Sequence, residues 1–342
     1  MRLNRLQPAT AVAAPDTGMP APYLPPGWLR NRWLQTGLAS LRLRARHTGN
    51  VLRPSRRRIL TTTKGVRLLG FDLPHPAPKG RVVLIHGWEG SSDSTYVRTT
   101  AASLYRAGYN VFRLNLRDHG PSHHLNEGVF LATYLDEVVE AVTRLAAEVP
   151  HLPVALCGFS LGGNFALRIA GRWGPEPPVN LRQVVAVSPA IDPIHSTESI
   201  DRHPALLWYF RRKWRRSLRR KQALFPHRYD FSDISPHMNL MEMTERLISR
   251  VSAYPDARTY LSAYAVTPAI YQRIRVPTAA ITALDDPVIP VADLTALPEN
   301  PRVERIVHAH GGHNGFLEAG LGTWYERWLV KRLKLLEAFS DK

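Results

Sequence analysis

Residues 154–163 read VALCGFSLGG, and residues 164–170 read NFALRIA. The run starts as a short apolar stretch, passes through Ser160 between glycines, and continues into a helical stretch. This order predicts a strand, a sharp turn and a helix, which is the setting of a G-x-S-x-G nucleophile turn. The flanking glycines fit such a turn because side chains there would strike the neighbouring strand or helix.

Ser160 is therefore the candidate nucleophile. The turn would present its Oγ above the edge of a sheet, and the following helix would offer N–H groups and the positive end of its dipole to a developing oxyanion. The amide of Leu161 is accordingly one candidate oxyanion donor. A chance match is the competing interpretation, since five-residue patterns of this kind occur in unrelated proteins.

Short apolar runs alternate with helix-length segments on both sides of this turn. The alternation predicts an α/β fold, with a mostly parallel sheet and helices on both of its faces. We expect strands at 81–86, 110–116, 154–159, 183–187, 278–284 and 302–308, and helices at 95–106, 130–147, 161–172 and 315–336. The alternation lapses after residue 188 and resumes at residue 276, which predicts an inserted helical cap at about 191–275.

The chain before the sheet differs in composition. Up to about Pro26 it is rich in proline and alanine and lacks a sustained period, so we expect a mobile or draped segment without catalytic residues. Residues 27–58 lack acidic side chains and accumulate arginines around tryptophans and leucines, which predicts a basic arm with a short helix. The expected division is a Pro/Arg-rich arm at 1–57 and a main domain at 58–342.

Composition excludes several classes of protein. No apolar run approaches the ~20 residues that span a bilayer, and prolines interrupt the N-terminal twenty residues, unlike a secretory signal. Cys157 is the only cysteine, so neither an internal disulfide nor a multi-cysteine zinc site can form. We expect a cytoplasmic protein that can also lie peripherally at the inner face of a membrane.

The formal charge of +17 favours anionic partners. Because arginine greatly outnumbers lysine, a biased genome composition explains this charge better than a specific anionic partner does. No recognition motif for nucleic acid is visible, so no specific nucleic acid partner is expected.

Residues 84–92 read LIHGWEGSS and follow an apolar run upstream of Ser160. A histidine and glycine after such a strand let the backbone turn, so that the amide of Trp88 can join that of Leu161 at a tetrahedral oxygen. We expect His86 itself to be structural.

An acid and a base follow Ser160 along the chain. Asp285 and Asp286 come directly after the expected strand 278–284, where parallel sheets place functional groups. His313 follows two glycines just before the last expected helix and is the candidate base, while His308 and His310 are expected to be strand or loop histidines. A neutral imidazole can take a serine proton near neutral pH, and a carboxylate on its other nitrogen fixes the tautomer. His119, His123, His124, Asp118 and Glu127 allow a metal cluster, but loop polarity explains them better because no helical i, i+4 pair is present.

With these motifs the chain resembles the YheT-like branch of the α/β-hydrolases, which also includes the ABHD lipid-ester hydrolases. The resemblance rests on residues 28–36 (WLRNRWLQT), the loop 86–92, the turn at Ser160, the Asp-Asp-Pro run at 285–287 and the Gly-Gly-His run at 311–313. In this fold the order is serine, acid, histidine, and an aspartate followed by Pro-x-x-Pro is the acid. The resemblance therefore favours Asp286 over Asp285, which is then expected to bond nearby amides.

The resemblance implies a serine esterase with the triad Ser160, Asp286 and His313, acting on acyl lipids or short-chain esters without metal or organic cofactor. Two features depart from the branch: residues 118–127 lack its Gly-Cys-Ser-Gly type of segment, and the arginine run of the cap is unusually dense. We expect both segments to shape the access of substrate to the site. Alternatives from other classes are a catalytically silent binding protein on this fold and a basic protein that associates with nucleic acid or membrane.

Residues 208–221 of the cap combine an apolar stripe with six arginines. Phe210, Trp214 and Leu218 recur at spacing four, and arginines crowd the remaining surface. Such a helix could lie in the headgroup layer of an anionic membrane. The competing interpretation, which is commoner for an inserted cap, is that the stripe packs onto the core beneath a solvated basic face.

Overall fold

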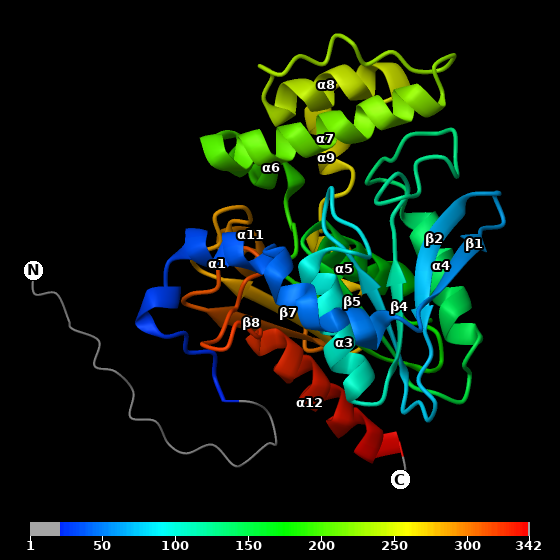
Figure 1. The fold of residues 1–342 in the computed structure, drawn as a ribbon, viewed down its shortest axis with the longest axis vertical. Coiled ribbons are helices and arrows are strands. Elements are labelled where there is room, and N and C mark those ends of the chain that lie inside the picture. The colour runs from blue at the N-terminus through cyan, green and yellow to red at the C-terminus, as the bar shows by residue number, and fades with distance from the viewer. Residues whose placement is uncertain (1–20, 341–342) are drawn as a thin grey trace, which may run out of the picture.

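Eight strands form the central sheet of the protein, in the order β1-β2-β4-β3-β5-β6-β7-β8. This arrangement comes from a computed structural model that describes residues 21–340 (Figure 1). Strands β3 to β8 run parallel, and β2 pairs antiparallel with both β1 and β4. The strands are β1 (Arg56–Thr61), β2 (Arg67–Leu73), β3 (Arg81–Ile85), β4 (Asn110–Leu114), β5 (Val154–Phe159), β6 (Leu181–Val187), β7 (Thr278–Ala283) and β8 (Val303–His308).

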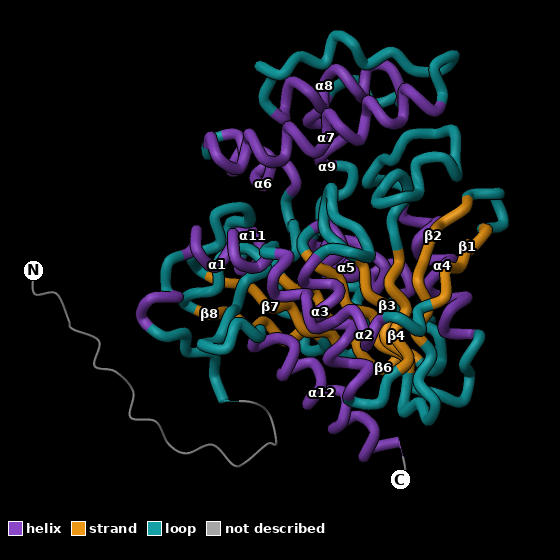
Figure 2. The backbone as a smooth tube through the Cα atoms, in the orientation of Figure 1, coloured by secondary structure: helices purple, strands orange, loops and turns teal. Residues whose placement is uncertain are grey.

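Helices cover both faces of the sheet (Figure 2). Side chains of β3 alternate between the faces: Val83 and Ile85 join the apolar cluster of α4 (Leu135–Ala147) and α5 (Leu161–Trp173), whereas Val82 and Leu84 join that of α3 (Thr95–Arg106) and α12 (Trp324–Ser340). Burial on both faces explains why the inner strands, such as β3, β5 and β7, are continuous apolar runs in the sequence. The expected α/β-hydrolase fold is confirmed.

The six expected strands match β3 to β8 within two residues at each end. Two expected helices begin too early, however. Helix α4 begins at Leu135 because residues 130–134 form a turn, in which the Phe130 amide donates to Asp118 and the Ala132 amide to Tyr260. Helix α12 begins at Trp324, after a loop that contains positive φ angles at Asn314, Phe316 and Leu321.

The N-terminal arm forms η1 (Gly27–Leu29), α1 (Arg32–Ala39), η2 (Arg42–Thr48) and α2 (Gly49–Leu52), and it packs against α3. Gln35 is fully buried. Its side-chain amide donates to Leu29 O and to Tyr23 Oη, both at 2.7 Å, and its carbonyl oxygen accepts from Leu317 N at 2.8 Å. Of the two expectations for that stretch, mobile or draped, its end at residues 21–26 fits the draped one, because Tyr23 is buried and donates to Leu317 O. Its first twenty residues lie outside the described residues.

The edge hairpin of β1 and β2 was not expected from the sequence. Strand β1 begins at Arg56, so the expected boundary between residues 57 and 58 falls inside a strand. Arginine at three successive positions, Arg56, Arg57 and Arg58, hides the alternation that marks a half-buried strand.

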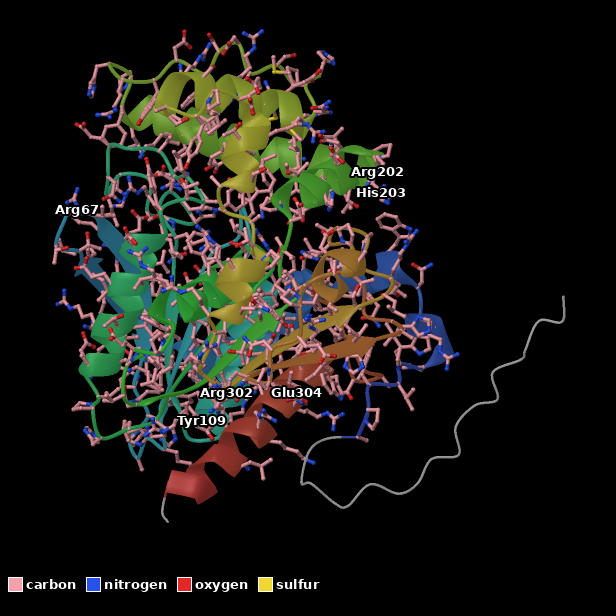
Figure 3. The ribbon with its side chains drawn as sticks, turned by 180° about the vertical axis from the view of Figure 1, so that it is seen from behind. Arg67, Tyr109, Arg202, His203, Arg302 and Glu304 are labelled. Atoms are coloured by element: carbon pink, nitrogen blue, oxygen red, sulfur yellow. The ribbon has the colours of Figure 1, made fainter. Side chains whose placement is uncertain are left out.

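Between β6 and β7 the chain leaves the sheet and forms α6 (Pro193–Asp201), α7 (Pro204–Leu224), α8 (Leu240–Val251), α9 (Ala257–Ser262) and α10 (Pro268–Gln272). Helices α6 to α9 lie above the carboxyl ends of the strands (Figure 1). Figure 3 shows Arg202 and His203 at the end of this helical layer that faces the N-terminal arm, and the ring of His203 lies 5.1 Å from that of Trp33. Within residues 21–340, no helix has the length and apolar character that crossing a membrane requires.

The close approach of α5 to β3 gives a first prediction. A Cβ atom at Gly162 would lie 2.3 Å from Ile85 O and 2.6 Å from His86 O, both of which are main-chain atoms. We expect Gly162→Ala to lower the free energy of unfolding by about 3 kcal/mol, because the backbone must shift. Equilibrium urea unfolding measures the change.

Gly37→Ala is the matched control. Gly37 lies in α1 with open space around its Cβ position, and alanine there should be neutral or stabilise the protein by about 0.5–1 kcal/mol. Equal urea midpoints for the two variants would contradict the close packing of α5 on β3.

Candidate active site

Ser160 occupies the turn between β5 and α5 with φ 54° and ψ −116°. A positive φ is uncommon for a residue other than glycine, so the surrounding structure must hold it in place. The Ser160 amide donates to Val187 O at 2.9 Å, and Asn164 N donates to Ser160 O at 2.9 Å. At Gly158 a Cβ atom would lie 2.0 Å from Gly162 O, so the turn has no room for a side chain there.

His313 lies in the loop between β8 and α12 and contacts the Ser160 side chain. Its Nε2 is 3.0 Å from Ser160 Oγ, and its Nδ1 is 2.9 Å from Asp286 Oδ2. An ionised carboxylate only accepts hydrogen bonds, so the proton of a neutral imidazole lies on Nδ1 and Nε2 is free to accept. The arrangement can therefore move a proton from the Ser160 hydroxyl to His313.

The two neighbouring aspartates, Asp285 and Asp286, have different hydrogen-bond partners. The carboxylate of Asp286 is fully buried, and its Oδ1 also accepts from the amides of Val288 and Ile289 at 2.8 and 3.0 Å. Asp285 instead accepts from Gly312 N at 2.9 Å. The structure thus brings Asp286 to the imidazole and Asp285 to the backbone of the loop that carries it.

The N-terminal arm supports the His313 loop, which the sequence did not indicate. Thr36 of α1 accepts a hydrogen bond from the His313 amide at 3.0 Å. Gly312 has φ 54°, and a Cβ atom there would lie 2.5 Å from Arg32 O. The arm string at 28–36 was part of the resemblance, but neither charge nor periodicity predicts that Thr36 meets a loop nearly three hundred residues later in the chain.

The loop after β3 lies on the other side of Ser160. His86 is fully buried, donates from Nδ1 to Gly87 O at 2.8 Å and accepts at Nε2 from Leu116 N at 3.2 Å. Burial holds the pKa of His86 well below its usual range, so it stays neutral and structural. The Trp88 ring stacks on Phe210 of α7 with centroids 5.5 Å apart.

Ser160, Trp88 and Leu161 line one cavity of about 100 Å³ beneath the inserted helices. None of the residues that line it carries a charge, and most are apolar. The inserted helices supply Ile200, Phe210, Trp214, Leu240, Leu247 and Leu261, and the sheet domain supplies Phe130, Ala132, Val288 and Ile289. This chemistry suits an apolar group attached to the reacting carbon.

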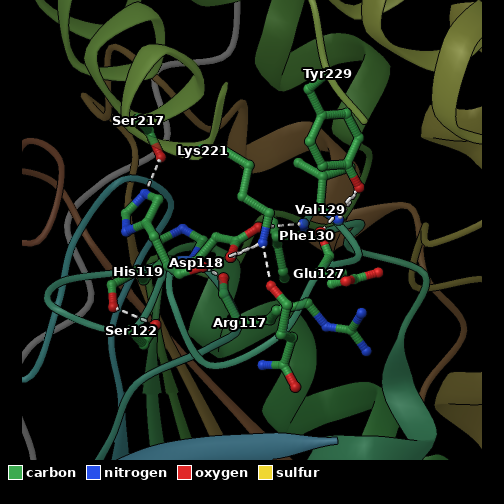
Figure 4. A network of polar contacts seen from close by, with 12 residues as sticks. Arg117, Asp118, His119, Ser122, Glu127, Val129, Phe130, Ser217, Lys221 and Tyr229 are labelled. Atoms are coloured by element: carbon green, nitrogen blue, oxygen red, sulfur yellow. Dashed lines mark hydrogen bonds and ion pairs between the residues drawn. The ribbon is translucent and has the colours of Figure 1, made fainter. Parts of the chain in front are cut away.

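A polar seam joins α7 to the segment 117–130 (Figure 4). Lys221 is buried and donates from Nζ to Asp118 Oδ1 at 2.8 Å and to the carbonyl oxygens of Asn126 and His123 at 2.6 and 3.3 Å. Asp118 Oδ2 accepts from the amide of Phe130, a residue of the cavity wall. Burial raises the pKa of Asp118 and lowers that of Lys221. One ion pair thus fixes both a cap helix and a wall of the cavity.

The metal interpretation of this segment gains no support. His123 Nε2 lies 2.8 Å from Ser217 Oγ, and His119 Nδ1 donates to Arg117 O. In the part of the chain that the structure describes, no group of three histidine, cysteine, aspartate or glutamate side chains is placed to hold a metal ion.

Comparisons with known proteins place the chain among the α/β-hydrolases. The family described as "Serine aminopeptidase, S33" matches residues 76–318. The YheT protein of Escherichia coli is 26% identical over 264 residues, which cover 75% of this chain and 75% of YheT. The monoacylglycerol lipase ABHD2 of Mus musculus is 23% identical over 346 residues, which cover 90% of this chain and 79% of that protein.

The fold also resembles that of the Pyrococcus furiosus esterase Pf2001. The two chains superpose with a TM-score of 0.56 and 17% identity, over 84% of this chain and 95% of the esterase. At this identity the likeness concerns the fold alone.

The seam generates the second prediction. Lys221→Met leaves Asp118 buried without its partner, so we expect a loss of about 3 kcal/mol in the free energy of unfolding. The double variant Lys221→Met/Asp118→Asn removes both charges and should recover part of that loss. Urea unfolding of the two single variants and the double variant gives the coupling.

Arg228→Met is the control, since the ion pair of Arg228 with Glu127 is exposed and should contribute less than about 1 kcal/mol. If the losses of the single variants simply add in the double variant, the pair is not coupled and the account of the seam is wrong.

Proposed function

The chain belongs to the S33 family of α/β-hydrolases and is a serine ester hydrolase of the esterase or lipase type, and from this premise we propose that Ser160, His313 and Asp286 are its catalytic triad. The contact of His313 Nε2 with Ser160 Oγ, at 3.0 Å, is the observation that carries the proposal. The position of Asp286 on the opposite nitrogen supports it further.

The reaction follows from these contacts. Ser160 Oγ attacks the carbonyl carbon of the ester while its proton moves to His313 Nε2. The tetrahedral oxygen accepts hydrogen bonds from the amides of Trp88 and Leu161. His313 then gives the proton to the departing alcohol, which leaves an acyl group on Ser160.

A water molecule attacks this acyl-enzyme in the second half of the reaction. His313 again takes the proton, and Asp286 stabilises the imidazolium and keeps the ring oriented. No step calls for a metal or an organic cofactor.

For the substrate we propose a carboxylic ester of an acyl lipid or of a short acyl chain. The uncharged and largely apolar lining of the cavity supports an aliphatic acyl group beside Ser160. The name of the relative ABHD2, a monoacylglycerol lipase, agrees with a lipid ester. Residues 191–275 then act as the cap that shields the acyl chain from water.

Peripheral contact with an anionic membrane, at the inner face in a cytoplasmic protein, completes the proposal. A lipid ester is presented at a membrane surface, and the net charge of +17 favours an anionic one.

The role of Ser160 is tested by Ser160→Ala. We expect loss of labelling by a fluorophosphonate probe and a fall in turnover of a p-nitrophenyl ester by a factor on the order of 10⁴ to 10⁶, with an unchanged circular dichroism spectrum. Ser249→Ala, on the exposed side of α8, should label and turn over as the wild type does. Labelling that persists in Ser160→Ala, or a loss of only tenfold, would refute the assignment, and a wild type that never labels would favour the silent binding protein.

The role of the acid is tested by comparing Asp286→Asn with Asp285→Asn. The first removes the charge opposite the imidazole and should lower kcat by about 10⁴. The second keeps an oxygen that can accept from Gly312 N and should stay within about tenfold of the wild type. A larger loss in Asp285→Asn would show that the acid was assigned one residue out of place.

A further inference from the structure

The two sides of α7 have opposite chemistry. Trp214 and Leu218 on the inner side are buried, and with Phe210 they pack toward Trp88 and the apolar cluster of the cap. The outer side carries a groove of about 340 Å³, lined by Trp208, Pro236, Arg211, Arg212, Arg215, Arg216 and Arg219. The apolar stripe is therefore not free to enter a membrane, and the alternative in which it packs inward holds.

The arginines of this groove form no ion pair with an aspartate or glutamate among residues 21–340. The charge of Arg211 does act on Asp201, where it opposes the rise that burial causes in the pKa of that carboxyl. Arg211 and Arg215 donate instead to the carbonyl oxygens of Met238 and Ile234, which fixes their side chains against the loop beyond α7. Arg212 lies over the ring of Trp208. Contacts with the protein therefore hold three of the five guanidinium groups of the groove, those of Arg211, Arg212 and Arg215.

Like charges crowd each other along this face. Desolvation and the neighbouring charges of Arg219 and Arg211 lower the pKa of Arg215. Repulsion between arginines one turn apart destabilises a helix, and a bound anion removes that cost.

From these observations we propose that the groove on the outer side of α7 is a binding site for the phosphate group of anionic phospholipid headgroups. The guanidinium groups offer the paired N–H donors that match phosphate oxygens. Trp208, which lines the groove and is 55% exposed, is an aromatic residue of the type that lies at the level of headgroups.

The proposal rests on the proposed function, because the inner side of the same helix lines the ester cavity. Binding of headgroups to the outer side holds the cap of that cavity against the membrane that contains the substrate. The contact is electrostatic and shallow, so it must weaken steeply as salt is added.

Reversal of three arginines tests the site. Arg212, Arg216 and Arg219 are exposed, and their replacement by glutamate leaves the Arg211 and Arg215 bonds intact. In low salt, we expect sedimentation with phosphatidylserine/phosphatidylcholine vesicles to fall about 100-fold in partition coefficient relative to wild type. Neither protein should sediment with phosphatidylcholine alone.

A matched control changes the same net charge elsewhere. Arg42, Arg46 and Arg57 of the N-terminal segment are exposed, and their replacement by glutamate should leave vesicle binding within about threefold of wild type if the groove is the site. An equal loss in both triple variants would show that net charge alone drives binding, and unchanged binding of the α7 variant would also overturn the proposal.

Two further measurements distinguish a lipid headgroup from a soluble phosphate and from a nucleic acid. Inorganic phosphate that binds the wild type, but not the α7 variant, as tightly as the vesicles do would overturn the headgroup assignment in favour of a soluble phosphate. A DNA duplex, added at the same concentration of negative charge as the vesicles, would overturn the headgroup assignment in favour of nucleic acid if it displaced the wild type from them.

Turnover of a water-soluble p-nitrophenyl ester, which needs no membrane, should stay within about twofold of wild type in both triple variants. If soluble turnover is absent in every protein while vesicle binding follows the pattern above, the hydrolase proposal fails and the binding site stands. If turnover is intact and vesicle binding does not depend on α7, the headgroup site is refuted and the hydrolase proposal stands.

Discussion

The backbone of Ser160 is held at a positive φ because its amide donates to Val187 O of β6, while α5 starts at the next residue and packs against the end of β3. Only glycines at 158 and 162 permit this approach. The result is a hydroxyl fixed above the carboxyl edge of the sheet, where the loops after β3, β7 and β8 can meet it.

The parts of the fold that the sequence predicts are those in which a local pattern has one physical cause. Strands β3 to β7 are buried on both faces and are therefore short apolar runs, whereas the edge strand β8 is partly exposed. The Ser, Asp and His candidates follow β5, β7 and β8 in order. The hairpin β1–β2 escapes the pattern because its outer strand is an exposed edge rich in arginine. The support of the His313 loop by Thr36 and Gln35 depends on contacts between distant parts of the chain, and no local period records such contacts. The ion pair of Lys221 could not be predicted from the sequence either. A lysine in an arginine-rich helix is expected to be solvated, but Lys221 is buried.

Helix α7, in the insertion between β6 and β7, has one side against the cavity and the other against solvent. The inner residues of α7 close an uncharged cavity over Ser160, and the outer arginines face solvent. Lys221 and Asp118 tie that helix to the segment that also supplies Phe130 to the cavity. The position of the cap and the shape of the acyl site are therefore linked through one buried ion pair. We expect removal of either charge to alter substrate binding as well as the stability of the fold.

The most direct test of the central claim is to trap the acyl-enzyme of the unmodified protein. The protein would be mixed with a p-nitrophenyl ester, quenched in acid at intervals from milliseconds to seconds, digested, and analysed by mass spectrometry. We expect the peptide that contains Ser160 to gain the mass of the acyl group, at the rate at which p-nitrophenol is released. An acyl group on any other residue, such as the buried thiol of Cys157, or steady turnover with no acyl adduct at any quench time, would contradict it.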